Sequence, residues 1–117
     1  MTKKIAYICC PLGASTQEEI QNNIANAERY SIWAEWGGFK TIIPHRLATI
    51  LNDEDPEHRR MGIEIDIKIL FPLADVIFVF GSRISSSMEK EINLAKEKNI
   101  EVRYFSIINN SIVEVFN

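Results

Sequence analysis

The chain has 117 residues, of which 46% are hydrophobic and 25% are charged, a size and composition typical of one globular domain. Its 13 basic and 16 acidic residues give a net charge of −3 and form no block of one sign, which argues against a polynucleotide partner. None of the five glycines has the spacing of a dinucleotide-binding or P-loop motif, and no apolar stretch is long enough to span a membrane.

The cysteines and the N-terminus indicate the compartment. Cys9 and Cys10 are adjacent, which is poor geometry for a disulfide between them and fits no metal-binding motif. The apolar run that follows Lys3 and Lys4 is too short for a signal peptide. We therefore expect reduced thiols, a cytoplasmic location, no metal and no cofactor.

The first part of the chain predicts a strand, a helix and a second strand. The apolar run over 4–10 is ended by a proline, as expected for a strand buried on both faces. Ser15 and Thr16 each precede a glutamate by three residues, and apolar residues then recur at helical spacing up to Gly37. This is the pattern of a capped amphipathic helix. A second strand is predicted over 39–44.

A connection over 45–55 leads into a second predicted helix. Asp55 supplies an N-cap, Pro56 occupies the first helical position, and the helix extends toward Pro72. This helix carries the apolar residues Met61, Ile65, Ile69 and Leu70.

The last part of the chain predicts a strand, a helix and a further strand. Residues 75–81 form an unbroken run of β-branched and aromatic side chains, which favours a central parallel strand. A helix is predicted over 85–98 and a fourth strand over 101–105. The tail over 107–116 is compatible with a strand or a hairpin, although two adjacent asparagines interrupt it.

Strands that alternate with helices predict right-handed βαβ units and a parallel sheet covered on both faces. We predict an α/β fold, a single three-layer flavodoxin-like domain with a mostly parallel sheet of four or five strands in the order 2-1-3-4-5. Ligands bind such sheets beyond the carboxyl ends of the strands, where the strand order reverses. The candidate ligand-binding residues at these ends are Cys9, Cys10, Pro11, Leu12, Pro44, His45, Gly81, Arg83, Ser85, Ser86, Ser87 and Met88.

The turn after the third strand is rich in hydroxyl groups. Arg83 and the three serines from Ser85 to Ser87 lead into a predicted helix N-terminus, where free N–H groups and the helix dipole favour an anion. These side chains are suited to hold a phosphate. The alternative is that Ser86 and Glu89 form only a capping box.

Glu91 lies one helical turn after Ser87, so it is positioned to face the same ligand. Near a helix N-terminus the charged form of a carboxylate is favoured, which suits a nucleophile or a base. The alternative is an ordinary solvent-exposed glutamate.

Four short segments form a pattern that extends over most of the chain, from about residue 4 to residue 105. They are Tyr7–Leu12 after the first strand, Pro44–His45 after the second, Ala74–Ile77 at the start of the third, and Ser87–Ile92 in the following helix. This pattern resembles the nucleoside 2-deoxyribosyltransferase-like superfamily, in particular its small uncharacterised phage and bacterial members.

The resemblance implies a nucleotide-directed N-glycosidase or deoxyribosyltransferase that acts on nucleosides or their 5′-monophosphates. In that family a glutamate at the place of Glu91 attacks the anomeric carbon, and a serine near the place of Ser87 binds a 5′-phosphate. Tyr7 would orient the carboxylate or the sugar, and His45 is a candidate proton donor beside the base. The implied partner is a small-molecule nucleotide or nucleoside, and the implied assembly is a homodimer or a larger homo-oligomer.

The sequence departs from the family pattern in two places. An aspartate before the third strand contacts the leaving base in characterised relatives, and the candidate Asp66 stands nine residues before Asp75, one more than expected. Either the helix contains a one-residue insertion, or Asp66 faces elsewhere, since one residue rotates a helical side chain by about 100°. Met88 also replaces a small residue and would crowd the sugar. A second hypothesis therefore stays open, a non-catalytic module that binds or sequesters a nucleotide or an ADP-ribose-like signalling molecule.

Overall fold

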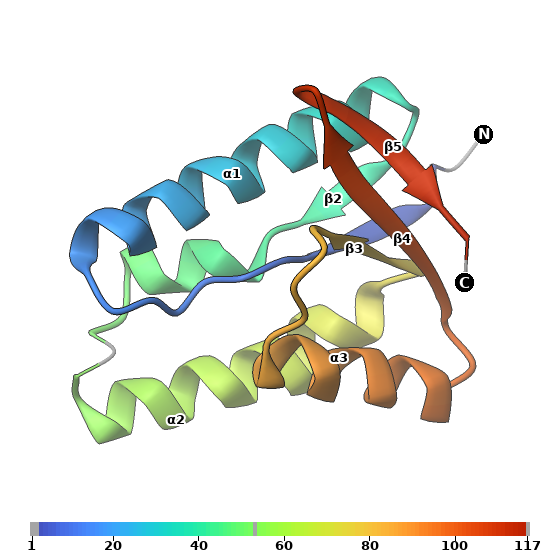
Figure 1. Ribbon diagram of the computed structural model, residues 1–117. Coiled ribbons are helices and arrows are strands. Elements are labelled where there is room, and N and C mark those ends of the chain that lie inside the picture. Colours follow the sequence, from blue (N-terminus) through green and yellow to red (C-terminus); the bar gives the residue numbers. More distant parts are fainter. Residues whose placement is uncertain (1–2, 53, 117) are drawn as a thin grey trace.

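The computed structural model describes residues 3–52 and 54–116, and its architecture is a three-layer α/β sandwich (Figure 1). The strands are β1 (Ile5–Cys9), β2 (Lys40–Ile42), β3 (Val76–Phe80), β4 (Glu101–Ile108) and β5 (Ser111–Val115). The α-helices are α1 (Gln17–Trp36), α2 (Pro56–Ile65) and α3 (Ser86–Glu97). The five strands form one sheet in the order β2-β1-β3-β4-β5. All neighbours are parallel except β4 and β5, so the predicted fold class and strand order are confirmed.

The two faces of the sheet are covered by different helices. Helix α1 packs on one face, and α2 and α3 lie on the other (Figure 1). Because side chains alternate along a strand, β1 sends Ile8 toward α1 and Tyr7 toward α3. Strand β3 is buried along its whole length, as expected of a central parallel strand.

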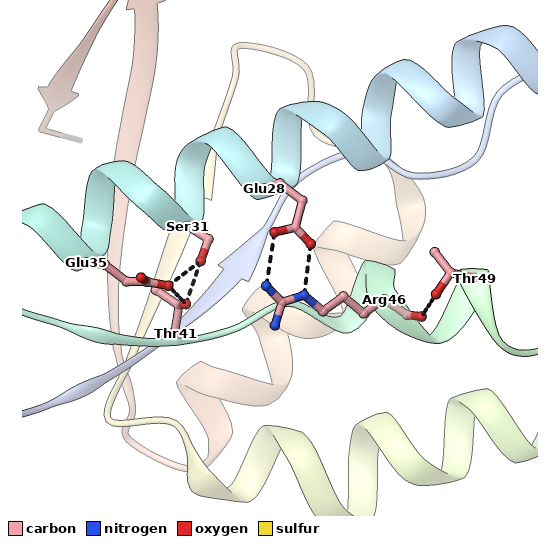
Figure 2. Close-up of polar contacts among 6 residues, drawn as sticks. All are labelled: Glu28, Ser31, Glu35, Thr41, Arg46 and Thr49. Carbon is pink, nitrogen blue, oxygen red and sulfur yellow. Dashed lines mark hydrogen bonds and ion pairs between the residues drawn. The ribbon is translucent and has the colours of Figure 1, made fainter.

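Helix α1 begins as the sequence predicts and is tied to the neighbouring strand. The Thr16 side chain accepts a hydrogen bond from the Glu19 amide at 3.1 Å, which identifies Thr16 rather than Ser15 as the N-cap. Near the other end of α1, Ser31 and Thr41 both donate to the Glu35 carboxylate at 3.0 Å (Figure 2). These bonds fix α1 against β2.

The chain between 56 and 73 is one continuous helical segment with three successive geometries. Helix α2 is followed by a π-helical turn over Asp66–Leu70 and a short 3₁₀ turn over Phe71–Leu73. Asp55 caps α2 by accepting from the Glu57 amide at 2.9 Å, as predicted. Of the apolar residues on this segment, Met61 and Ile69 are exposed, and Ile65 and Leu70 are partly buried.

Two segments left without a definite structure by the sequence are regular. The predicted connection begins with a 3₁₀ helix over Pro44–Thr49. The tail forms a hairpin in which β5 pairs antiparallel with β4. Asn109 and Asn110 make its two-residue turn with positive φ angles of 50° and 62°. Asparagine tolerates this conformation, so the two residues promote the hairpin instead of interrupting it.

Candidate functional site

A cluster of three polar side chains lies on the α3 side of the sheet. The Tyr7 hydroxyl is 2.6 and 2.7 Å from the two carboxylate oxygens of Asp66, and it also forms a short hydrogen bond with Oε2 of Glu91. The three residues are 59 and 84 positions apart in the sequence. They come from β1, the π turn and α3, so the fold alone brings them together.

The π turn determines where Asp66 points. Its defining bond runs from the Phe71 amide to the Asp66 carbonyl, five residues back. A π turn accommodates one residue more than an α-helical turn, and with this turn Asp66 faces Tyr7. The alternative that Asp66 faces elsewhere is therefore wrong.

Helix α3 positions Glu91 through an unusual N-terminus. Ser85 is the N-cap and accepts from the Met88 amide at 3.3 Å, while the Met88 sulfur receives the Ser85 amide at 3.5 Å. The alternative capping box of Ser86 and Glu89 is therefore wrong. Met88 is 1% exposed and packs in the core beside Tyr7, so its side chain is occupied in capping and packing.

Burial makes it unfavourable to ionise both carboxyl groups of the cluster at the same time. A phenol has a single proton to donate, yet the Tyr7 oxygen is hydrogen-bonded to both Asp66 and Glu91. Burial is the main cause that raises the pKa of Glu91 to about 8, and the nearby negative charge of Asp66 adds to it. Burial also raises the pKa of Asp66. The arrangement suits proton transfer between the two carboxyl groups through the Tyr7 hydroxyl.

Cys9 completes the surroundings of Glu91. Its Sγ atom lies 3.6 Å from Oε1 of Glu91, the oxygen that does not contact Tyr7. Cys9 is fully buried, so its side chain faces the glutamate instead of an open ligand site.

A small cavity lies on the opposite, α1 side of the same strand ends. Its volume is about 170 Å³, which is below the usual range of roughly 300–1,000 Å³ for pockets that enclose a whole small-molecule ligand. Its lining residues are Cys10, Pro11, Asn23, Asn26, Tyr30, Phe80, Gly81, Ser82 and Arg83. Arg83 is the one charged residue among them, so the cavity favours an anionic group.

Three cavity residues on α1 are absent from the sequence-based candidates. Asn23, Asn26 and Tyr30 follow each other at spacings of three and four residues, which places them on one helix face. Asn23 is held by a bond of 2.9 Å from its amide nitrogen to the Leu12 carbonyl. Their helical spacing is the one signal in the sequence that could have identified them as a group. Tyr30, however, also fits the apolar face of α1.

His45 is separated from the carboxylate cluster. Its Nε2 atom lies 3.5 Å from the Cys10 sulfur and 3.1 Å from the Pro11 carbonyl, and its Nδ1 atom is buried without a partner among the described residues. Burial lowers the pKa of His45. The neighbouring Arg46 pairs with Glu28 through two bonds of 2.8 and 3.0 Å (Figure 2). These contacts fix the 3₁₀ helix on α1, and the imidazole is a buried neutral group rather than an exposed proton donor.

The remaining predicted residues divide into two groups. Arg83, Ser86 and Ser87 are exposed at and before the N-terminus of α3, where they are accessible to a ligand. Leu12 and Pro44 are partly buried beside the ends of β1 and β2. Within residues 3–52 and 54–116, no group of three histidine, cysteine or acidic side chains is arranged to hold a metal ion. No helix in this part of the chain is long and apolar enough to cross a membrane.

Comparison with known sequences gives a family without an assigned activity. The model of a domain of unknown function, DUF7768, matches residues 4–105, which include the carboxylate cluster and the cavity. No curated protein matches the chain. Because the match extends over most of the sequence, the chain belongs to the DUF7768 family.

Proposed function

We propose that the chain is an N-glycosidase or deoxyribosyltransferase that acts on nucleoside 5′-monophosphates through Glu91 as a carboxylate nucleophile. The observation that carries this proposal is the buried Tyr7–Asp66–Glu91 cluster, in which one hydroxyl bridges two carboxyl groups. Paired carboxyl groups in different protonation states are typical of glycosidic-bond cleavage, because the ionised group acts as nucleophile and the protonated group, whose pKa is raised, acts as acid.

In the proposed reaction, the Tyr7 hydroxyl first redistributes the shared proton. Glu91 passes its proton to the Tyr7 oxygen while the Tyr7 proton moves to Asp66, so Glu91 becomes ionised and Asp66 neutral. The Glu91 carboxylate then attacks the anomeric carbon and forms a C–O bond. The C–N bond breaks, and its electron pair leaves with the base, which takes the proton from Asp66.

A second attack completes the cycle. Water or an acceptor base attacks the anomeric carbon of the glycosyl-enzyme, and the electron pair of the C–O bond returns to Glu91. The proton released by the attacking nucleophile goes to Asp66. Ser86 and Ser87 are exposed in the first turn of α3, and with the helix dipole they are the groups proposed to bind the 5′-phosphate.

Base release from nucleotides tests this proposal. We expect free base when the chain is incubated with deoxynucleoside 5′-monophosphates, measured by liquid chromatography. Glu91→Gln is expected to reduce the rate by roughly a thousandfold or more, because it removes the nucleophile. Glu89→Gln is the matched control, since Glu89 is exposed on the same helix. The proposal is wrong if no nucleotide releases base, or if Glu91→Gln releases base at the rate of the unmodified chain.

A non-catalytic nucleotide-binding module is the second candidate function. It is favoured by the cavity on the α1 side, because Glu91 is not among its lining residues. Its size and single cation suit one anionic group of a nucleotide or an ADP-ribose-like molecule. Calorimetric binding of a nucleotide that is weakened by Arg83→Gln, kept in Glu91→Gln and followed by recovery of intact ligand would select this function over catalysis.

A further inference from the structure

We infer that the Cys9 thiol is a positioning residue for Glu91, which it orients by donating a hydrogen bond to the carboxylate oxygen that Tyr7 leaves free. The contact itself is independent of the proposed reaction. Only the expected effect on turnover depends on the proposed function.

The geometry places one side chain of β1 against each oxygen of the Glu91 carboxyl group. Tyr7 contacts Oε2 of Glu91, and the Sγ atom of Cys9 lies 3.6 Å from Oε1. Tyr7 and Cys9 are two residues apart on β1, so their side chains leave the strand on the same face. A carboxylate held at one oxygen can still rotate about its last carbon–carbon bond, whereas contacts at both oxygens fix its plane.

The surroundings keep the thiol in the donating form. Cys9 is fully buried, with 0% of its surface accessible to solvent. Burial and the adjacent negative charge of Glu91 both raise the pKa of the Cys9 thiol. A protonated thiol is a weak donor, and its bond to Glu91 is strengthened when Glu91 is ionised, because a charged acceptor strengthens a hydrogen bond.

The donated bond also favours the ionised form of Glu91. A hydrogen bond to a carboxylate lowers its pKa, and the Cys9 bond acts on Glu91 in this direction, against the larger effect of burial. The neighbouring Cys10 faces the other side of the sheet, where its sulfur contacts His45. Cys10 therefore provides a matched control thiol of the same chain.

Titration of the Glu91 carboxyl carbon by NMR tests the inference, with Glu91→Gln to assign the signal. Cys9→Val removes the donor at similar volume and is expected to raise the pKa of Glu91 by about half a unit to one unit. Cys9→Ser retains a donor and is expected to restore most of this shift. Cys10→Val is expected to leave the Glu91 titration in place. If the proposed function holds, Cys9→Val lowers kcat by about tenfold with little change in KM, and Cys9→Ser recovers most of it.

Infrared spectroscopy gives a second measurement that needs no substitution of Cys9. The S–H stretching band of the unmodified chain contains contributions from Cys9 and Cys10, and Glu91→Gln is expected to move only the Cys9 contribution. An unmoved band, together with an unchanged Glu91 titration in Cys9→Val, overturns the inference. Both readouts decide it even if no nucleotide releases base, so failure of the proposed reaction is distinguishable.

Discussion

At the scale of residues, the Tyr7–Asp66–Glu91 cluster makes the stability of the folded chain depend on the ionisation of its carboxyl groups. Two carboxyl groups are placed around one phenol in a largely apolar layer. Ionising both carboxyl groups would place two negative charges in this apolar environment, so the folded chain retains a proton that the unfolded chain releases. The cost is sensitive to pH and is therefore measurable.

The first prediction concerns the pH dependence of the free energy of unfolding. The pKa of Glu91 rises from 4.5 to about 8 on folding. Between these values the folded state binds more protons than the unfolded state, so stability decreases as pH rises. Each unit of pKa difference corresponds to about 1.4 kcal/mol. Urea denaturation between pH 5 and 8 is expected to show a smaller decrease in Glu91→Gln than in the unmodified chain or in Glu89→Gln. Parallel curves for all three would contradict this assignment.

At the scale of elements, the π turn over Asp66–Leu70 decides whether Asp66 contacts Tyr7. Deletion of the exposed Lys68 is expected to convert the turn into regular α-helix, which rotates Asp66 by about 100° relative to the buried Phe71. Asp66 then no longer contacts Tyr7, so its carboxyl group is expected to titrate as an exposed aspartate by NMR. If the proposed function holds, base release is also expected to fall. Lys68→Ala keeps the chain length and is expected to change neither. An unaltered Asp66 titration in the deletion variant would show that the π turn is not what orients it.

The β4–β5 hairpin provides a prediction that is independent of function. Asn109 has a φ angle of 50°, a conformation that costs a β-branched residue about 1–2 kcal/mol. Asn109→Val is expected to lower the free energy of unfolding by this amount. Asn110→Gly is expected to be neutral or slightly stabilising, because glycine adopts positive φ freely. Ser111→Val, one residue into the extended strand, is the control and is expected to be tolerated. Equal stability of the two valine variants in chemical denaturation would contradict the turn assignment.

At the scale of the whole molecule, the sheet separates two hydrophobic cores. The core on the α1 side is aromatic: Phe105 stacks on Phe80 at 5.1 Å and packs against Phe78 at 4.9 Å and Trp33 at 5.1 Å. Phe105→Ala is expected to cost about 3–5 kcal/mol, a large share of the roughly 5–15 kcal/mol that stabilises a typical domain. Ile108→Ala, at an exposed position of the same strand, is expected to cost less than about 1 kcal/mol. Urea denaturation measures both, and similar losses would contradict the assigned core.

The two tryptophans near the end of α1 differ in their exposure, and the expected homo-oligomer stays a prediction. Trp33 is 39% exposed, and its ring packs edge-on against Phe80 and Phe105, so it contributes a core contact. Trp36 is 88% exposed at the end of α1. A homodimer or larger homo-oligomer is expected from the family resemblance alone, and sedimentation of the unmodified chain tests it.

The sequence by itself determined the order of the strands and helices. Alternation of apolar strands with capped helices is a local property, and for a parallel sheet the handedness of the crossovers leaves few topologies. Asp55 and Thr16 marked helix starts because an N-cap bonds within its own first turn. Helical spacing and the family resemblance make Glu91 a candidate, and the resemblance alone adds Tyr7, as a group that orients the carboxylate or the sugar, and Asp66. The contact of Asp66 with Tyr7 was not predictable, because the direction of Asp66 was left open.

Only the tertiary structure decided the parts that depend on distant contacts. Whether Asp66 faces Tyr7 depends on a π turn, and a π turn has no local signature in the sequence. His45 and Met88 are candidate site residues in the sequence. In the folded chain His45 is buried beside Cys10, and the Met88 sulfur accepts a hydrogen bond from the Ser85 amide at the start of α3. The contact of Cys9 with Glu91 joins β1 to α3 across 82 positions of the sequence. Such a contact exists only after both elements have packed, since local sequence sets the direction of a side chain but not what it meets.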